Sequence, residues 1–219
     1  MNKKKMELTR RYQRKIAKHA KKRTDISDHL ISLFKQTIAS NPKLIVEIGI
    51  RSGESSFVFN RAAIVCDSFL VGVDIDDCSS VYKKMKKRGK RKFIKGDDIE
   101  IGKSFQQTMK SLKYPTTIDV LFIDTSHLYD HTVKEINTWF PLLSKKCTVI
   151  FHDTNLKPTF KRKDGTLGRG WDNERGVIRA LEEFLNTKFN EDTAFHIKIG
   201  EWQIIHIPYC NGLTILKRL

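Results

Sequence analysis

The chain alternates short apolar runs with longer segments of helical character, and this alternation constrains its fold more than any other feature. Strands are expected at 43–48, 69–74, 92–95, 118–123 and 147–151. Helices are expected between them, at 53–64, 78–88, 100–112 and 130–143. Apolar and β-branched residues on consecutive positions are typical of strands that are covered on both faces. Strands that alternate with helices connect through right-handed crossovers, so the sequence predicts a doubly wound, parallel α/β sheet.

The C-terminal part of the chain departs from this alternation. After a loop at 154–172 and a helix at 174–187, two strand-like runs follow at 194–207 and 212–218 with no helix between them. Consecutive strands without a crossover helix can pair as an antiparallel hairpin. We therefore expect one seven-stranded, mostly parallel sheet that ends in an antiparallel hairpin.

The N-terminal segment is strongly basic. Residues 1–23 hold eleven of the chain's 41 lysines and arginines against one acid. Apolar residues recur there every four positions, which is typical of a helix with a thin apolar stripe, namely Leu8, Tyr12, Ile16 and Ala20. A second helix follows, capped by Thr24 or Asp25. We expect a basic helical extension at 1–24, suited to packing on a neighbouring subunit of a homo-oligomer, and a single domain at 25–219.

Composition and charge narrow the class of protein. No apolar run approaches the roughly 18 residues of a membrane span, and the charged N-terminus lacks a signal-peptide core, so a cytoplasmic protein is expected. The four cysteines are far apart, which argues against a thiolate zinc site or a disulfide framework. The net charge of +16 and a second basic run at 83–95 suit an anionic partner. Neither basic segment interleaves aromatic residues that would stack on bases, so a solubilising role is equally compatible.

The residues at the strand ends carry the chemistry, because ligands of open α/β sheets bind beyond the carboxyl ends of the strands. The first strand ends in Glu47-Ile-Gly49, and Gly53 follows four residues later. Glycines there permit a tight turn and a close approach of the main chain to a ligand. The spacing is neither a dinucleotide G-x-G-x-x-G nor a phosphate loop. Asp74 closes the second strand 21 residues after Gly53, a position suited to ribose hydroxyls, and Asp97 follows the third strand.

The fourth and fifth strands end in a second set of polar residues. The segment FIDTSHLYD at 122–130 ends its strand on Asp124, and FHDT at 151–154 ends the fifth strand on His-Asp. Because neighbouring parallel strands end at one edge, Asp124 and Asp153 should lie close together. Two adjacent carboxylates favour a bound cation, and oxygen ligands suit Mg²⁺. His127 is a candidate general base because histidine titrates near neutral pH.

The ordered set of glycines and strand-end acids resembles the class I S-adenosylmethionine-dependent methyltransferases. The resemblance covers residues 40–219, including the closing hairpin that distinguishes this Rossmann-like fold from dinucleotide-binding folds. The pair FIDTSHLY and FHDT is most similar to the small-molecule O-methyltransferase branch of the catechol, macrolide-sugar and cephalosporin-hydroxylase-like type.

This resemblance implies a role for each residue of the cofactor set. Gly49 and Gly53 would let the main chain approach the methionine part of the cofactor, and Ser55 would bind its carboxylate. Asp74 would hold the ribose hydroxyls, and Asp97 would lie near the adenine amino group. Asp124 would also belong to the cofactor-binding set, and Glu47 would be a supporting residue.

The resemblance also implies a metal-assisted reaction. Mg²⁺ or another divalent cation would be held by Asp124, His152 and Asp153 and would lower the pKa of an acceptor hydroxyl. His127 would remove the proton before the oxygen attacks the methyl group. Metal-dependent relatives often carry Asp-Asn, Glu-Asp or Asp-Asp at the fifth strand, whereas this chain has His-Asp. A histidine there suits a softer ion or a purely structural role.

The acceptor is not identified by the sequence. A small molecule with a sugar or phenol hydroxyl is implied, and the basic loops favour an anionic one. A nucleic-acid methyltransferase is the alternative that the basic N-terminus supports, although no Asn-Pro-Pro-Tyr-type motif follows the fourth strand. A third hypothesis is a non-catalytic binding protein that uses its basic arm. The glycine-containing loop at 154–172 is placed to close over a substrate.

Overall fold

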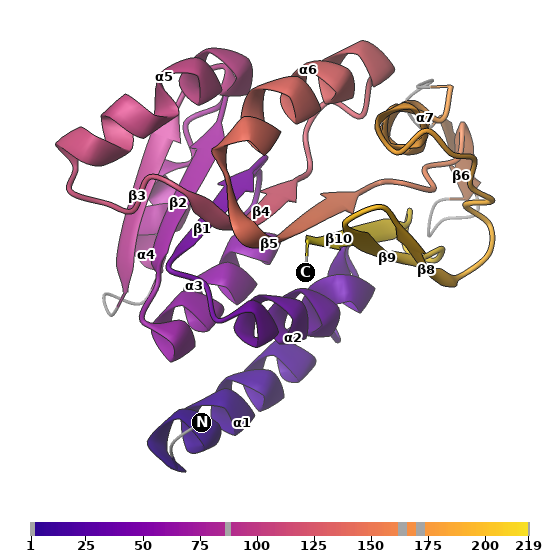
Figure 1. Cartoon of the computed structure of the whole chain (residues 1–219). Coiled ribbons are helices and arrows are strands. Elements are labelled where there is room, and N and C mark those ends of the chain that lie inside the picture. The colour runs from indigo at the N-terminus through magenta and orange to yellow at the C-terminus, as the bar shows by residue number, and fades with distance from the viewer. Residues whose placement is uncertain (1–2, 86–88, 162–165, 170–173, 219) are drawn as a thin grey trace.

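The structure is a computed structural model that describes residues 3–85, 89–161, 166–169 and 174–218. Eight strands form one sheet in the order β3-β2-β1-β4-β5-β10-β9-β8, and helices cover both of its faces (Figure 1). The strands of this sheet are β1 (Leu44–Ile48), β2 (Phe69–Asp74), β3 (Lys90–Lys95), β4 (Ile118–Ile123), β5 (Leu143–His152), β8 (Phe195–Ile199), β9 (Trp202–Ile207) and β10 (Leu213–Arg218). The helices are α1 (Lys3–His19), α2 (Leu30–Ser40), α3 (Glu54–Cys66), α4 (Ser79–Lys84), α5 (Asp98–Ser111), α6 (Tyr129–Trp139) and α7 (Gly176–Phe184).

The first five strands form the parallel part of the sheet. β1 pairs in parallel with β2 and with β4, while β3 and β5 extend the sheet on either side. The chain therefore leaves β1 first toward β2 and β3, and then returns to the other side of β1 for β4 and β5. This reversal of strand order creates the crevice in which open α/β sheets bind ligands. The predicted doubly wound, mostly parallel sheet is confirmed.

The C-terminal strands are antiparallel, as predicted, but there are three of them. β10 lies between β5 and β9 and pairs with both in antiparallel orientation, and β8 forms the edge. The run at 194–207, expected as one strand, turns at Gly200, whose φ of 54° lies in the left-handed region that glycine adopts without strain. The sheet consequently has eight strands rather than seven.

The core lies on both faces of the parallel strands. Successive residues of a strand point to opposite faces, so Ile45 and Phe122 pack with α2 and α3, whereas Val46 and Leu121 pack with α5, α6 and α7. All four side chains are fully buried. This arrangement explains why the strands are apolar on consecutive positions, and it fixes the strand ends against which the site is built.

The basic N-terminal helix packs on its own chain. The helix expected within 1–23 runs from Lys3 to His19, and residues 1–2 lie outside the described part. Tyr12 and Ile16 are buried in the same apolar cluster as residues of α2 and α3. A 3₁₀ turn at Ser27–His29 follows, so α2 begins at Leu30, later than the predicted cap at Thr24 or Asp25.

Two sequence expectations fall partly outside the described residues. The loop at 154–172 contains a small antiparallel hairpin of β6 (Thr159–Lys161) and β7 (Leu167–Arg169), and residues 162–165 and 170–173 are not described. The helix expected at 78–88 ends at Lys84, and residues 86–88 are not described.

Within the described ranges, none of the helices combines the length and the apolar character that a membrane crossing requires.

Candidate functional site

The carboxyl ends of the parallel strands surround a cavity of about 400 Å³, which we call the strand-end cavity. This volume lies within the usual range of small-molecule sites. Four residues of the predicted cofactor set line the cavity, namely Gly49, Asp74, Asp97 and Asp124. The other three, Glu47, Gly53 and Ser55, are not among its lining residues.

Gly49 is required by close packing at the end of β1. Its φ is 84°, and a Cβ at this position would lie 1.8 Å from the carbonyl oxygen of Asp124. Any larger residue would push the ends of β1 and β4 apart.

Gly53 also has a positive φ, 85°, and a Cβ there would meet the side chain of Val81 at 2.3 Å. Gly53 therefore lets the start of α3 pack closely against the start of α4.

Asp74 organises the turns around the strand-end cavity. Its Oδ2 accepts hydrogen bonds from the backbone N–H groups of Ile50 at 2.7 Å and Arg51 at 3.1 Å. Its Oδ1 accepts one from the N–H of Asp76 at 2.9 Å. The carboxylate thus ties the loop after β1 to the loop after β2, and Oδ1 keeps a further lone pair for a ligand.

Glu47 and Ser55 form a buried support beside the cavity. The hydroxyls of Ser55 and Ser56 each donate to a carboxylate oxygen of Glu47 at 2.6 Å, and the Tyr82 hydroxyl donates at 3.4 Å. Burial raises the pKa of Glu47 to about 7, although the serine hydroxyls lower it. The side chain of Ser55 is therefore directed at Glu47, and the pair connects β1 to the first turn of α3.

The cavity has further lining residues that the sequence did not single out. Ile75 is 68% exposed although it is aliphatic, and it lines the cavity directly after Asp74. An isoleucine between acids in VDIDD is unusual for a polar loop, and this pattern is the signal by which the sequence could have marked Ile75 as a lining residue. Asp98 and His131 also line the cavity. Asp97 itself is exposed and caps α5 by accepting a hydrogen bond from the N–H of Glu100 at 3.0 Å.

The ends of β4 and β5 bring four predicted residues together in what we call the Asp124–Asp153 cluster. His127 Nε2 lies 2.8 Å from Asp153 Oδ2 and 3.4 Å from Asp124 Oδ1. His152 Nδ1 lies 3.3 Å from Asp153 Oδ2 and 3.4 Å from Asp124 Oδ1. The expected convergence of the two carboxylates is observed, with both histidines between them.

The electrostatics of this cluster are strongly coupled. Burial lowers the pKa of His127, but the hydrogen bonds to Asp124 and Asp153 outweigh it and raise that pKa to about 9. The pKa of His152 is raised as well, against its burial, by the charge of Asp124. The pKa of Asp153 is lowered, against its burial, by the two histidines. Two imidazolium groups and two carboxylates can thus neutralise one another.

Two observations mark this cluster as more than an ion-pair network. His127 and Asp153 both have left-handed backbone conformations, with φ values of 60° and 56°, and such strain concentrates at functional sites. In addition, His127 Nδ1, Asp153 Oδ1 and His152 Nε2 are buried without a hydrogen-bond partner among the described residues, and His152 Nδ1 has only its two ion-pair contacts. Buried polar atoms rarely stay unpaired unless a ligand, an ion or water satisfies them.

The donor set fits a divalent cation. One donor atom each from Asp124, His152 and Asp153 lies within 4.8 Å of the others. Carboxylate oxygens suit Mg²⁺ and Mn²⁺, whereas an imidazole nitrogen suits transition ions such as Mn²⁺ or Zn²⁺. The chemistry of the predicted ligands is therefore compatible with one ion.

A second cavity of about 290 Å³, the loop cavity, lies against Asp153. It is lined by the segment that follows β5 and by residues before, within and after α7, namely Asp153, Thr154, Asn155, Leu156, Lys157, Pro158, Glu174, Arg175, Ile178 and Glu191. Asp124 lines the strand-end cavity, and Asp153 lines the loop cavity. His127 contacts both carboxylates, so the Asp124–Asp153 cluster lies between the two cavities.

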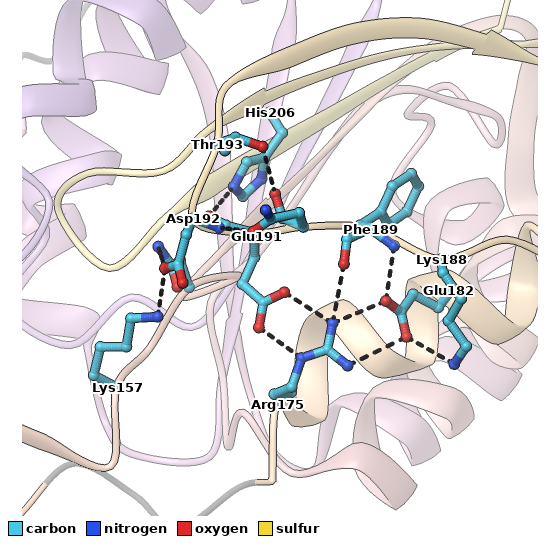
Figure 2. Close-up of polar contacts among 11 residues, drawn as sticks. Lys157, Arg175, Glu182, Lys188, Phe189, Glu191, Asp192, Thr193 and His206 are labelled. Carbon is cyan, nitrogen blue, oxygen red and sulfur yellow. Dashed lines mark hydrogen bonds and ion pairs between the residues drawn. The ribbon is translucent and has the colours of Figure 1, made fainter.

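Arg175 fixes the wall of the loop cavity (Figure 2). Its guanidinium donates to Glu182 Oε1 at 2.8 Å and to Glu191 at 2.6 and 2.8 Å. Glu182 is buried and also accepts from the N–H of Phe189 and the ammonium of Lys188. These bonds tie the start of α7 to the chain that leads into β8. The sequence did not single out this network.

Residues 46–154 match the model of a family described as "Methyltransferase domain". The matched segment begins in β1 and ends just after β5, so it contains both carboxylates of the Asp124–Asp153 cluster. A curated relative, "Uncharacterized protein y4gI" of Sinorhizobium fredii (strain NBRC 101917 / NGR234), is 23% identical over 129 residues. This alignment covers 54% of the chain and 14% of the relative, so the chain spans a small part of that protein.

Solved structures share the fold at low sequence identity. The SAH-bound methyltransferase PaMTH1 of Podospora anserina superposes with a TM-score of 0.58 at 14% identity, over 100% of this chain and 97% of that one. MycE, a methyltransferase of the mycinamycin pathway in complex with Mg, SAH and mycinamycin VI, gives 0.53 at 17%, over 88% and 49%. CalS11, a TDP-rhamnose 3′-O-methyltransferase of calicheamicin biosynthesis, gives 0.51 at 16%, over 99% and 95%.

Proposed function

Because the chain belongs to the S-adenosylmethionine-dependent methyltransferases, we propose that it transfers the cofactor's methyl group to a hydroxyl oxygen of a small molecule. The observation that carries this proposal is the position of His127, 2.8 Å from a carboxylate of the loop cavity and 3.4 Å from a carboxylate of the strand-end cavity. A cofactor in the strand-end cavity and an acceptor in the loop cavity would meet at this histidine.

The residues of the strand-end cavity suit the cofactor. S-adenosylmethionine supplies an electrophilic sulfonium methyl group when bound. Asp74 Oδ1 has a free lone pair for a ribose hydroxyl, Ile75 offers an apolar surface to the adenine, and Asp97 would accept from its amino group. The side chain of Ser55 is engaged with Glu47. We therefore propose that the carboxylate of the cofactor is bound by backbone N–H groups at the N-terminus of α3, where the helix dipole favours an anion.

A divalent cation fits the Asp124–Asp153 cluster and would be held by Asp124, His152 and Asp153. Such an ion supplies positive charge that lowers the pKa of an acceptor hydroxyl. This assignment is supported by the buried Oδ1 of Asp153, which lacks a hydrogen-bond partner among the described residues, and by His152 Nδ1, which faces both carboxylates at 3.3 and 3.4 Å. His127 Nε2 is the group that would take up the hydroxyl proton, because it lies at hydrogen-bond distance from the carboxylate that lines the loop cavity. It would do so in its neutral form, which the raised pKa of about 9 makes the minor form at neutral pH.

The charges around the loop cavity favour a neutral acceptor with several hydroxyls, such as a sugar. Lys157 is paired with Asp192 at 2.5 Å, and Arg175 is paired with Glu182 and Glu191. Among the described lining residues, no cation is left to bind an anionic group. Polar walls of mixed charge instead offer donors and acceptors to hydroxyl groups. The proposed acceptor is therefore neutral, whereas the basic loops in the sequence favoured an anionic one.

Isothermal titration with S-adenosylhomocysteine tests the cofactor part. The wild-type protein should bind, and Asp74→Asn should weaken binding roughly 10- to 100-fold, the range expected for a lost charge-assisted hydrogen bond. Asp77→Asn is the matched control, since Asp77 lies in the same loop but does not line the cavity. The absence of binding to a folded wild-type protein would refute the proposal. Transfer of a labelled methyl group to RNA, and to no sugar or phenol, would instead support the nucleic-acid alternative.

A further inference from the structure

A second group of metal-type side chains lies apart from the Asp124–Asp153 cluster. Asp98 is the first residue of α5, and His131 and Glu135 lie one turn apart on α6. Residues four positions apart on a helix project from the same face. We call these three residues the Asp98 cluster, and none of them is used in the proposed transfer reaction.

The distances in the Asp98 cluster match those around a single ion. His131 Nε2 lies 3.1 Å from Asp98 Oδ1 and 3.7 Å from Glu135 Oε1, and one donor atom from each residue lies within 4.8 Å of the others. Metal–ligand bonds of about 2.1 Å place neighbouring donor atoms about 3 to 3.5 Å apart. A small movement of the Glu135 carboxylate would complete such an arrangement.

Burial leaves two carboxylate oxygens of this cluster without a hydrogen-bond donor among the described residues. The Glu135 side chain is fully buried, and Thr125 donates to its Oε1 at 2.6 Å, but its Oε2 has no hydrogen-bond partner in the described structure. Asp98 Oδ2 is likewise buried and unpartnered there. Burial and the charge of Asp98 raise the pKa of Glu135 to about 8. Two carboxylates and one imidazole are therefore gathered in a buried place, with two oxygens that a cation could satisfy.

We propose that Asp98, His131 and Glu135 bind a divalent transition-metal ion, such as Zn²⁺ or Mn²⁺, at a site separate from the Asp124–Asp153 cluster. The imidazole ligand favours a transition ion over Mg²⁺ or Ca²⁺. Asp98 and His131 line the strand-end cavity, so the ion can enter from that side and keep open positions toward it. The ion fastens the start of α5 to α6 and thereby fixes one wall of the cavity.

The test must separate the two clusters. Asp153→Asn removes a ligand of the Asp124–Asp153 cluster, and in this background Mn²⁺ and Zn²⁺ are titrated into chelator-treated full-length protein by calorimetry. The expected result is one remaining ion, whose affinity falls at least 100-fold when His131→Gln or the nearly isosteric Glu135→Gln is added. His196→Gln is the matched control, because this exposed histidine of β8 belongs to neither cluster.

Thermal unfolding gives a readout that does not depend on activity. At an ion concentration about 100 times the dissociation constant, Zn²⁺ should raise the melting temperature of the Asp153→Asn protein by roughly 5–10 °C. The Glu135→Gln protein should fold without the ion and show no such rise. Equal binding by the Asp153→Asn protein with and without His131→Gln would overturn the proposal. Binding of Mg²⁺ in preference to Zn²⁺ and Mn²⁺ would also overturn it.

Discussion

The two cavities on either side of the Asp124–Asp153 cluster are held in shape by different means. The strand-end cavity is shaped by the main chain: Gly49 lets β1 and β4 end in contact, and Asp74 holds the N–H groups of Ile50 and Arg51. The loop cavity is shaped by side chains, above all the ion pairs of Arg175 and Lys157. The contacts of the first are part of the sheet itself. Those of the second lie on loops and on α7, outside the sheet.

This difference separates the general part of the chemistry from the specific part. A pocket built from strand ends and turns is set once the fold is set, so it suits a cofactor that many relatives share. A pocket built from paired charges outside the sheet can be altered by a few substitutions, so it suits an acceptor that differs between relatives. His127 lies at the boundary, bonded to one carboxylate from each side.

The largest effect is expected at this boundary. His127→Asn should lower the turnover number by about 10²- to 10⁴-fold, the usual contribution of a general base. Asparagine tolerates the left-handed backbone of this position better than most residues, so the protein should stay folded. Calorimetry with S-adenosylhomocysteine and steady-state kinetics should show cofactor affinity and acceptor KM within about threefold of wild type.

His196→Asn serves as the control for His127→Asn, since it removes an exposed histidine from β8. If His127→Asn kept more than a tenth of the turnover, the histidine would not be the base. If it instead abolished cofactor binding, His127 would belong to the strand-end cavity alone, and the proposed boundary would be wrong.

A smaller effect, confined to one cavity, is expected at Arg175. Arg175→Gln breaks the pairs with Glu182 and Glu191, so it should raise the acceptor KM about tenfold and leave the cofactor affinity unchanged. It should also lower the free energy of unfolding by about 1–2 kcal/mol, less than for a fully buried pair because Arg175 is partly exposed.

Arg179→Gln is the matched control for Arg175→Gln. Both arginines have 43% exposed side chains, but Arg179 contacts only the exposed Glu174, at 3.5 Å, and the ring of Tyr129 among the described residues. Kinetics and thermal unfolding should show a clear defect for Arg175→Gln and a marginal one for Arg179→Gln. Equal losses of cofactor and acceptor binding in Arg175→Gln would show that the two cavities are not independent.

The same contrast explains what the sequence could predict. The parallel sheet and the convergence of Asp124 and Asp153 follow from apolar strands that each end on an acid, and both are observed. The expected family is confirmed by the match over 46–154. These features are local: a strand, its end and the first residue beyond it.

The features that the sequence did not reveal depend on contacts between distant segments. The partners of Arg175 lie 7 and 16 residues away, and as isolated letters they look like ordinary surface charges. The Asp98 cluster joins two helices whose packing is not encoded in any short motif. Gly200 alone gave too weak a turn signal to divide β8 from β9. Ser55 was assigned by its place in a motif, whereas the direction of its hydroxyl depends on the burial of Glu47.

The smallest effect is expected for substitution of Ser55. This substitution tests whether the main chain, rather than a side chain, binds the carboxylate of the cofactor. Ser55 and Ser56 are neighbours with equal 2.6 Å hydrogen bonds to the two oxygens of Glu47. Ser55→Ala and Ser56→Ala should therefore lower the free energy of unfolding by a similar amount, about 1–2 kcal/mol, because each leaves a buried carboxylate oxygen short of a donor. Neither should change the affinity for S-adenosylhomocysteine by more than about twofold, since the backbone N–H groups at the start of α3 remain. A tenfold loss of affinity in Ser55→Ala alone, measured by calorimetry on folded protein, would show that its hydroxyl turns from Glu47 to the cofactor. The strand-end cavity would then depend on side chains as the loop cavity does.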